Sequence, residues 1–345
     1  MKILMIGLGG IGQRHARNIR RLMGDSVEVF AYRVRGLTHE ITQKLTVNDQ
    51  ANVEKLLDIR SYTNLDEALS THPEAAFICN PSSLHIESAT MAAKAGCHLF
   101  IEKPLSHSLD GNEELIRIVK QKELTAMVGF QLRFHPCYLK MREHLLNNDI
   151  GMPLAVKAEV GEYMPGFHKY EDYRQIYAAK NKLGGGVVLT QIHEVDYLYS
   201  LFGVPESVYA LGGHLSSLEI DVEDTACILM QCRNNTKVLP VSLHMDYLQK
   251  PPVRTCAVVG ECGKVEVDFV NLTACLYNDQ GQLSEKSEYH EFDRNQLFLD
   301  EISHFFESIE NQSQPLVSLE EGLASLRVAL AIKASLASGK PEYLN

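Results

Sequence analysis

The sequence predicts a two-domain α/β protein, with a doubly wound parallel sheet first and then an α+β domain that carries a large open mixed or antiparallel sheet. Three observations predict this fold class. Short apolar runs alternate with amphipathic stretches over about the first 125 residues, which is typical of right-handed βαβ units. A glycine-rich turn follows the first run. From about residue 150 the runs succeed one another with only short polar turns between them.

The first domain is expected over residues 1–125. Its predicted strands are 2–6, 27–32, 75–79, 98–101 and 125–129. These are continuous apolar runs, which is typical of parallel strands that helices cover on both faces. Between the strands apolar residues recur at helical spacing, as at Ile86, Ala89 and Ala93.

The second domain is expected over residues 126–345. Its predicted strands are 155–163, 207–214, 224–232, 237–246, 254–260 and 264–269, with helices near 191–202 and 295–310. Several strands alternate apolar and polar residues, which indicates a sheet with one covered and one open face. The last helix, 318–338, begins at Ser318, and Glu321 completes a capping box. We expect that this helix can pack back on the first domain.

Charge and composition exclude several classes of protein. The chain has 345 residues, with 33 Lys and Arg against 44 Asp and Glu, and its net charge is −11. Nucleic-acid binding needs a surplus of basic side chains on one face, so we expect no nucleic-acid partner. No apolar run reaches the roughly 20 residues that span a bilayer. The chain enters its first strand without a charged leader, and its eight cysteines form no Cys-x-x-Cys pair. We expect a cytoplasmic protein without membrane contact, whose cysteines are reduced and buried.

The glycine-rich turn reads Gly7-Leu8-Gly9-Gly10-Ile11-Gly12 and follows the first predicted strand directly. Gly7 permits the tight turn, Gly9 lets the backbone approach a pyrophosphate, and Gly12 lets helix and strand pack closely. The helix that begins here, with Gly10 and Ile11 in its first turn, offers free N–H groups to phosphate oxygens. A glycine turn without a ligand is the alternative. The place of the turn within a βαβ unit favours a dinucleotide site.

The end of the second strand indicates which dinucleotide binds. An acidic residue there would accept a hydrogen bond from the ribose 2′-hydroxyl of NAD. This chain has Arg33 and Arg35 instead, and a guanidinium matches a 2′-phosphate in charge and geometry. We therefore expect NADP as the cofactor, with NAD as the second choice. The alternative is that both arginines are solvated surface residues.

Two further segments carry candidate catalytic residues. Glu102-Lys103-Pro104 lies at the carboxyl end of a strand, where ligands bind, and Lys103 could exchange a proton with a substrate hydroxyl. Gly184-Gly185-Gly186 precedes a helix with His193 and Asp196 on one face, so His193 could act as acid or base while Asp196 orients it. The alternatives are a surface loop for Lys103 and a satisfied core residue for His193. The second segment lacks the two histidines of a helical zinc site, so we expect no metal.

In this order the motifs resemble the Gfo/Idh/MocA family of oxidoreductases (glucose–fructose oxidoreductase, inositol dehydrogenase and relatives), along almost the whole chain. The resemblance also rests on Asn80-Pro81-Ser82-Ser83-Leu84-His85, on Val128-Gly129-Phe130-Gln131-Leu132-Arg133-Phe134 and on the closing Ser318-Leu319-Glu320-Glu321-Gly322. It implies a Rossmann domain that binds NAD(P). It also implies a second domain that binds substrate and often makes oligomer contacts.

The resemblance implies roles for single residues as well. Lys103 would transfer a proton and His193 would be its partner. The residues near the ribose and nicotinamide would be Asn80, Pro81, His85, Glu102 and Arg133. Many members carry an aspartate three or four residues before that histidine, where this chain has Thr190 and Leu189. General acid–base help is worth roughly 10²–10⁴ in rate, so we expect this departure to tune activity, not to abolish it.

The substrate is expected to contact the loop before the glycines and the helix after them. The candidate residues are Tyr163, Tyr173, Arg174, Thr190 and Asp196. Aromatic rings and guanidinium groups suit polyols and phosphorylated sugars, by stacking and by paired hydrogen bonds. The alternative for the loop is an ordinary surface segment.

Together these features predict an NAD(P)-dependent dehydrogenase or reductase acting on CH–OH groups. Its substrate would be a secondary alcohol or ketone of a sugar, a nucleotide-sugar or an inositol-like polyol. It would assemble as a homodimer or homotetramer through the second sheet. Two other hypotheses stay open: a hydrolase or lyase that uses NAD for transient oxidation, and a catalytically inactive dinucleotide-sensing protein.

Overall fold

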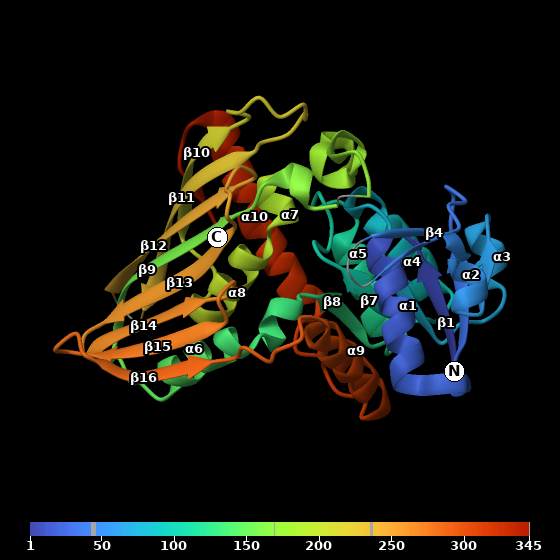
Figure 1. Cartoon of the computed structure of the whole chain (residues 1–345), viewed down its shortest axis with the longest axis horizontal. Helices are drawn as coiled ribbons and strands as arrows, with labels where there is room; N and C mark the ends of the chain where they lie inside the picture. The colour runs from blue at the N-terminus through green and yellow to red at the C-terminus, as the bar shows by residue number, and fades with distance from the viewer. Residues whose placement is uncertain (43–45, 169, 235–236, 345) are drawn as a thin grey trace.

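The computed structural model describes residues 1–42, 46–168, 170–234 and 237–344. Two sheets lie side by side with helices between them, a parallel sheet toward the N-terminus and a larger mixed sheet toward the C-terminus (Figure 1). The predicted fold class is therefore confirmed.

The first sheet has six parallel strands in the order β5-β2-β1-β6-β7-β8. Its strands are β1 (Lys2–Ile6), β2 (Glu28–Tyr32), β5 (Ile59–Tyr62), β6 (Ala75–Ile78), β7 (His98–Glu102) and β8 (Ala126–Gly129). Its helices are α1 (Gly10–Met23), α2 (Val53–Leu56), α3 (Leu65–Leu69), α4 (His85–Lys94) and α5 (Asn112–Gln121). The strand order reverses between β1 and β6, so a crevice for a ligand opens at their carboxyl ends.

Burial explains why these residues form central strands. Ile3, Leu4, Met5 and Ile6 are all 0% exposed, as expected for a strand that is covered on both faces. The structure adds β5 at one edge and a small ribbon of β3 (His39–Ile41) and β4 (Val47–Asn52), none of which was predicted.

The second sheet has nine strands in the order β16-β15-β14-β13-β9-β12-β11-β10-β17. Its strands are β9 (Pro153–Gly161), β10 (Ser207–Gly213), β11 (Thr225–Asn234), β12 (Lys237–Asp246), β13 (Val253–Gly260), β14 (Gly263–Asp268), β15 (Thr273–Asn278), β16 (Leu283–Glu288) and β17 (Glu342–Tyr343). All pairs are antiparallel except β9 with β12, so the sheet is mixed. The predicted strands are present, and β15 to β17 were missed.

Helices cover one face of the second sheet. They include α6 (Pro136–Leu146) against β14 and β15, α8 (His193–Phe202) against β9 and β11, and α10 (Leu319–Ser338) against β10. No helix lies on the opposite face among the described residues (Figure 1). The alternation along the strands follows this arrangement, because Ile228 and Met230 are buried while Leu229 between them is 60% exposed.

Both of the last two long helices contact the first sheet, and the final one also contacts the second sheet. Helix α9 (Asn295–Glu310) packs on the first sheet, where the Phe305 ring lies 5.7 Å from the rings of Phe77 and Phe100. The segment before α10 also meets this sheet, because the Val128 N–H donates to the Val317 carbonyl at 2.9 Å. Ser318 caps α10 through the Glu321 N–H. The division of the chain at residue 125 stays a prediction.

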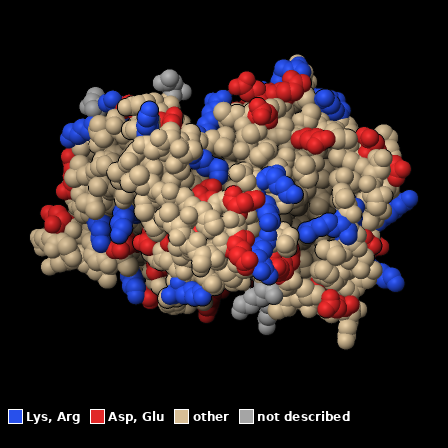
Figure 2. Space-filling model, turned by 90° about the horizontal axis from the view of Figure 1, so that it is seen from above, with Lys and Arg blue, Asp and Glu red and all other residues tan. Residues whose placement is uncertain are grey.

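Three further observations concern the surface. No described helix is long and apolar enough to cross a membrane. Five cysteines are buried, Cys275 is half-buried, and Cys227 and Cys262 are exposed, so the expectation that all cysteines are buried is wrong for the two exposed ones. On the face seen in Figure 2, acidic and basic side chains are interspersed over both halves of the molecule.

Candidate active site

The glycine turn between β1 and α1 forms a cradle, in which the Tyr170 hydroxyl would lie 2.6 Å from a Cβ on Gly10. Gly7 has a φ of +98°, and a Cβ there would lie 2.8 Å from the Asn80 nitrogen. A Cβ on Gly12 would lie 2.2 Å from the Gly7 oxygen, so strand and helix pack closely only without it. At Gly9 no described atom lies within 4 Å of that position. The backbone is therefore open to a ligand at Gly9 and closed by the protein on either side.

Helix α1 directs its N-terminus at this cradle. Its cap, Gly9, has no side chain to accept hydrogen bonds, and its first turn carries no acidic residue. The N–H groups of the first turn, at Gly10, Ile11 and Gly12, have no partner inside the helix and suit the oxygens of a pyrophosphate. The residues present fit an NAD(P) dinucleotide.

Arg33 at the end of β2 is held in an ion pair. Its Nη1 donates to Glu54 Oε1 at 2.8 Å, and Ser61 donates to the same oxygen at 2.6 Å. Arg33 is only 8% exposed, so the alternative of a solvated surface arginine does not hold for it. Arg35 is exposed. Glu54 was missed because nothing in the sequence pairs it with Arg33.

Lys103 and the segment after the triple glycine come together, although about 90 positions separate them. Lys103 Nζ donates to the carbonyl oxygen of Thr190 at 2.7 Å. Thr190 ends α7 (Val187–Thr190), and His193 begins α8. The charge of Lys103 lowers the pKa of His193, which places the two side chains in electrostatic reach of each other.

His193 is 4% exposed, and its Nδ1 has no hydrogen-bond partner among the described residues. Burial holds its pKa well below 6.5, and the positive charges of Lys103, Arg254 and Arg294 lower it further. The imidazole is therefore neutral at neutral pH and can accept a proton.

The residues expected near the ribose and nicotinamide mostly hold the strand ends in place. His85 is 2% exposed, and its ring nitrogens lie 2.9 Å from the carbonyl oxygens of Asn80 and Pro104. The amide of Asn80 donates to Ser88 at 2.9 Å, while its Oδ1 has no partner among the described residues. Pro81 precedes a short 3₁₀ turn. These residues follow β6, and through His85 they hold in place the segment after the neighbouring strand β7, which contains Lys103.

Arg133 and Asp196 form a buried ion pair. Arg133 Nε and Nη2 donate to the two oxygens of Asp196 at 2.7 and 3.0 Å, and Ser325 donates to Asp196 at 2.9 Å. The side chains of Arg133 and Asp196 are 6% and 1% exposed. The oxygens of Asp196 are therefore engaged by Arg133 and Ser325, and no hydrogen bond joins Asp196 to His193 among the described residues. The site roles of Arg133 and Asp196 stay predictions.

The loop before the triple glycine is only partly directed at the site. Arg174 bonds the carboxylates of Asp172 and Glu219, at 2.9 and 3.0 Å, and its role as a substrate contact stays a prediction. Tyr173 accepts a hydrogen bond from the Glu219 N–H at 3.3 Å and lies beside Arg174. Tyr163 is half-buried, with Lys250 Nζ 3.3 Å above the ring centroid.

Three arginines near the site were missed. Arg254 on β13 forms an ion pair with buried Glu194 at 2.8 Å. Arg294 caps α9, and burial together with the charges of Arg254 and Arg14 lowers its pKa. Arg14 lies with its guanidinium carbon 4.6 Å above the ring of Phe298. Only Arg14, two residues after the glycine motif, could have been singled out from the sequence, because the other two meet His193 through tertiary packing alone.

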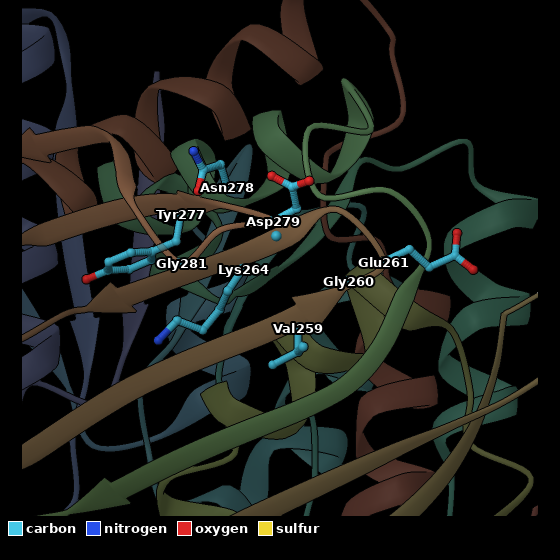
Figure 3. Close-up of a pocket in the computed structure, with 9 residues that line it drawn as sticks. Val259, Gly260, Glu261, Lys264, Tyr277, Asn278, Asp279 and Gly281 are labelled. Carbon is cyan, nitrogen blue, oxygen red and sulfur yellow. The ribbon is translucent and has the colours of Figure 1, made fainter.

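A separate hollow of about 460 Å³ lies at the tips of two β-hairpins (Figure 3). The residues lining it are Val259, Gly260, Glu261, Gly263, Lys264, Tyr277, Asn278, Asp279 and Gly281. The strand register places Gly260 beside Pro153, whereas the loop to the catalytic segment leaves the other end of β9, at Gly161. A nine-residue strand spans roughly 25 Å or more, so this hollow is remote from Lys103.

A dinucleotide cradle after β1, a lysine at the carboxyl end of β7 in the same sheet and a buried neutral histidine define an NAD(P)-dependent dehydrogenase that acts on CH–OH groups. The comparisons with known proteins identify the family. Residues 1–130 match the "oxidoreductase family, NAD-binding Rossmann fold" model, and residues 142–344 match the "oxidoreductase family, C-terminal alpha/beta domain" model. The chain belongs to the Gfo/Idh/MocA family.

Its relatives include dehydrogenases of inositols and nucleotide-sugars. The chain is 27% identical to myo-inositol 2-dehydrogenase of Thermotoga maritima, over 97% of this chain and 96% of the relative. The fold is shared with the WlbA dehydrogenase of Bordetella pertussis, solved with NADH and UDP-GlcNAcA, at a TM-score of 0.80, 22% identity and 100% and 99% coverage. It is also shared with scyllo-inositol dehydrogenase of Lactobacillus casei, solved with NAD(H) and scyllo-inositol, at a TM-score of 0.76, 22% identity and 99% and 98% coverage.

Proposed function

We propose that this protein oxidises a secondary alcohol, or reduces the corresponding ketone, of a sugar, a nucleotide-sugar or an inositol-like polyol. The observation that carries the proposal is the contact between Lys103 and Thr190, next to neutral His193 and beside the glycine cradle. When bound, the dinucleotide supplies a nicotinamide that accepts or returns a hydride. Lys103 and His193 handle the proton of the hydroxyl group.

The division of labour follows from the surroundings of the two residues. His193 is neutral and has a free ring nitrogen, so it can take the proton that leaves the substrate hydroxyl. Lys103 is held at 2.7 Å by a backbone oxygen, which fixes its Nζ without neutralising it and lets it stabilise a developing alkoxide. The main-chain oxygen of Thr190 thus serves as an acceptor for Lys103 in a segment that lacks the family aspartate.

The arginines near His193 favour a substrate with an anionic group. Arg294 has no hydrogen-bonded or ion-paired partner among the described residues. Its neighbours Arg254, which is paired with Glu194, and Arg14 are also cationic, while Glu162 is the acidic group that acts on it. An acidic sugar or a nucleotide-sugar would place negative charge there. We therefore rank these substrates above an uncharged inositol. Tyr163 and Thr190 remain proposed substrate contacts.

For the cofactor we propose NADP ahead of NAD, with Arg35 as the main contact to the 2′-phosphate and Arg33 behind it. Arg35 is exposed, whereas Arg33 is paired with Glu54. Calorimetric titration of both dinucleotides against wild type, Arg33→Ala and Arg35→Ala checks this. Selective loss of NADP affinity supports the proposal, and equal loss for both cofactors, or none, contradicts it.

The reaction is tested with Lys103→Ala on a panel of inositols, sugars, sugar acids and nucleotide-sugars. We expect the variant to bind the cofactor as wild type does and to turn over roughly 10²–10⁴ times more slowly. Lys182→Ala, on the surface of the neighbouring loop, is the matched control. Full turnover by the Lys103 variant contradicts its role. Cofactor binding without turnover by wild type on any substrate would favour the dinucleotide-sensing hypothesis.

We also propose that copies of the chain associate through the open face of the second sheet. Exposed apolar residues on it include Leu211, Leu229 and Val238, which are 57%, 60% and 53% exposed. A homodimer or homotetramer would cover them. Absence of nucleic-acid, membrane and metal partners, and a cytoplasmic location, remain predictions.

A further inference from the structure

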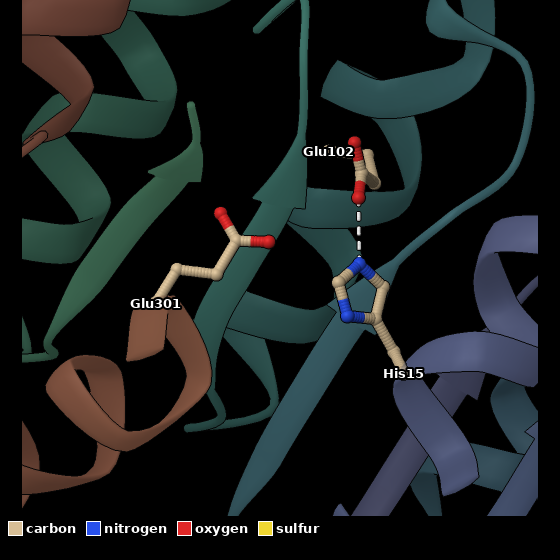
Figure 4. Close-up of side chains that lie close together, drawn as sticks. All are labelled: His15, Glu102 and Glu301. Atoms are coloured by element: carbon tan, nitrogen blue, oxygen red, sulfur yellow. Dashed lines mark hydrogen bonds and ion pairs between the residues drawn. The ribbon is translucent and has the colours of Figure 1, made fainter. Parts of the chain in front are cut away.

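Three ionisable side chains meet behind the strand end that carries Lys103. His15 comes from α1, Glu102 from the last position of β7, and Glu301 from α9 (Figure 4). His15 Nε2 lies 2.6 Å from Glu102 Oε1, and one donor atom from each of the three residues lies within 4.8 Å of the others. His15 and Glu301 are 0% exposed and Glu102 is 7% exposed.

The cluster lies in apolar surroundings. The His15 ring packs against Phe77, Phe100 and Phe298 at centroid distances of 5.8, 5.1 and 5.9 Å. Neither oxygen of Glu301 has a hydrogen-bond partner among the described residues. Two adjacent carboxylates that were both ionised here would be far more costly than one carboxylate and one neutral acid.

A proton fits this cluster better than a metal ion does. The 2.6 Å between His15 and Glu102 is a direct hydrogen bond, shorter than the separation of two ligands on one ion at about 2.0–2.1 Å from each. A metal-bound histidine also uses its second ring nitrogen to donate to an acceptor, and His15 Nδ1 has no partner among the described residues. Phenylalanine rings pack against the His15 ring, and among the described residues the group contains no further His, Cys, Asp or Glu.

The position of the cluster links it to the active site. His15 lies one turn after Gly12, on the helix whose N-terminus forms the cofactor cradle. Glu102 directly precedes Lys103 and its Oε2 accepts from the Lys103 N–H at 3.2 Å. A displacement of Glu102 therefore displaces Lys103 relative to α1.

We propose that His15, Glu102 and Glu301 form a proton-holding positioning cluster, in which a neutral Glu301 acid and the His15–Glu102 hydrogen bond fix Lys103 relative to the cofactor helix. Glu301 is a positioning residue, since it touches neither the cradle nor Lys103. Its role toward Lys103 rests on the proposed function, whereas the proton on Glu301 does not.

The groups around Glu301 support this distribution of protons. From β7 it faces the carboxylate of Glu102, from the end of β6 the buried thiol of Cys79, and from α1 the imidazole of His15, with Arg14 next to it. Burial, and then the charge of Glu102, raises the pKa of Glu301 well above 4.5. At alkaline pH the loss of this proton would set two carboxylates against each other and push Glu102 away.

The proton is tested by infrared spectroscopy and by pH-dependent unfolding of wild type and Glu301→Gln. Glu307→Gln, at an exposed position of the same helix, is the matched control. We expect wild type at neutral pH to show a protonated carboxylic-acid band that Glu301→Gln lacks and Glu307→Gln keeps. We also expect Glu301→Gln to gain stability over wild type progressively as the pH rises above about 4.5. If wild type lacks this band, and if the stability difference between wild type and Glu301→Gln does not change with pH, Glu301 carries no proton and this part of the proposal is wrong.

The positioning role is tested with Glu301→Ala and with Glu301→Gln as the rescue variant. We expect Glu301→Ala to lower kcat by roughly 10–10² while KM changes little, and Glu301→Gln to restore kcat and to lose the alkaline decline of wild type. A second measurement does not depend on turnover: it is the rate at which an acylating reagent labels the Lys103 amine, followed by mass spectrometry. This labelling rate should be higher in Glu301→Ala than in wild type, and Glu301→Gln should have the wild-type rate.

These readouts separate the cluster from the proposed reaction. If wild type turns over no substrate but Lys103 labelling responds to Glu301, the reaction is wrong and the positioning cluster stands. Unchanged labelling and unchanged kcat in a folded Glu301→Ala variant overturn the positioning role.

Discussion

At the scale of single residues, burial decides the charge of His193. A histidine in water titrates near pH 6.5, but inside the fold this ring would carry its charge in an apolar site, next to the charges of Lys103 and Arg254. Its pKa is therefore lowered, and the neutral form persists well below pH 6.5. The same placement that makes His193 a proton acceptor also makes the fold sensitive to acid.

This linkage predicts a pH-dependent effect of His193→Gln. Below about pH 6.5 the unfolded chain binds a proton at His193 that the folded chain refuses, so wild type loses stability as the pH falls toward the lowered pKa. The variant should therefore gain stability relative to wild type between pH 6.5 and 5, by at most about 1.4 kcal/mol per pH unit. Urea unfolding at several pH values measures this difference. His290→Gln, at a ring that is 69% exposed, is the control, and an equal gain there would contradict the assignment to His193.

At the scale of elements, the β1–α1 turn separates two functions of glycine. An added Cβ at Gly12 would meet the Gly7 oxygen at 2.2 Å, whereas one at Gly9 would meet no described atom within 4 Å. Gly12 is therefore required by the packing of helix against strand, and Gly9 only by the approach of a ligand.

The prediction is a matched pair of alanine variants. Gly12→Ala should lower the free energy of unfolding and weaken cofactor binding. Gly9→Ala, at a backbone φ of −76° that alanine accepts, should unfold like wild type and still lose cofactor affinity. Denaturant unfolding and calorimetric titration of both variants check this. Wild-type cofactor affinity in Gly9→Ala would mean that the pyrophosphate does not approach at that position.

The pair of Arg133 and Asp196 ties three elements together. Arg133 lies in the 3₁₀ helix η3 (Gln131–Phe134) and Asp196 lies in α8. Ser325, which also donates to Asp196, lies in α10. Asp196→Ala leaves the buried Arg133 guanidinium with only its 3.5 Å contact to Glu321, so we expect a loss of about 3–5 kcal/mol in the free energy of unfolding. Urea unfolding measures it. Glu114→Ala, which breaks the exposed pair with Arg117, should change stability little, and an equally small effect of Asp196→Ala would contradict the role of the buried pair.

The elements that the sequence predicted are those whose pattern follows burial. Strand β1 is apolar because both its faces are covered, and α10 is recognisable from its cap at Ser318. Strand β5 was missed because Arg60 and Ser61 give it no apolar run, and its pairing with β2 at the sheet edge comes from tertiary structure. Strand β16 was missed for the same reason, since it is largely exposed.

At the scale of the whole molecule, the site was predictable where a local motif carries it. Lys103 and His193 each lie in a motif of their own, and the structure brings these motifs together. The pairing of Asp196 with Arg133 could not be predicted, because helical spacing shows which side chains share a face but not which partner they meet across the domain. The contact of Glu301 with His15 joins opposite ends of the chain, so only the folded structure displays it.

The open face of the second sheet determines how copies of the molecule can associate. Strand pairing places Leu229 beside Tyr209 on β10 and Ser242 on β12, within a surface that no described helix covers. A charge at this position would have to be buried on association, at a cost of several kcal/mol per ion. We therefore expect Leu229→Glu to reduce the molar mass measured by light scattering to that of a smaller assembly, with the fold retained by circular dichroism. Leu56→Glu, at an exposed leucine of the first domain, is the control. An oligomer that tolerates Leu229→Glu but dissociates with Leu56→Glu would place the interface on the first domain.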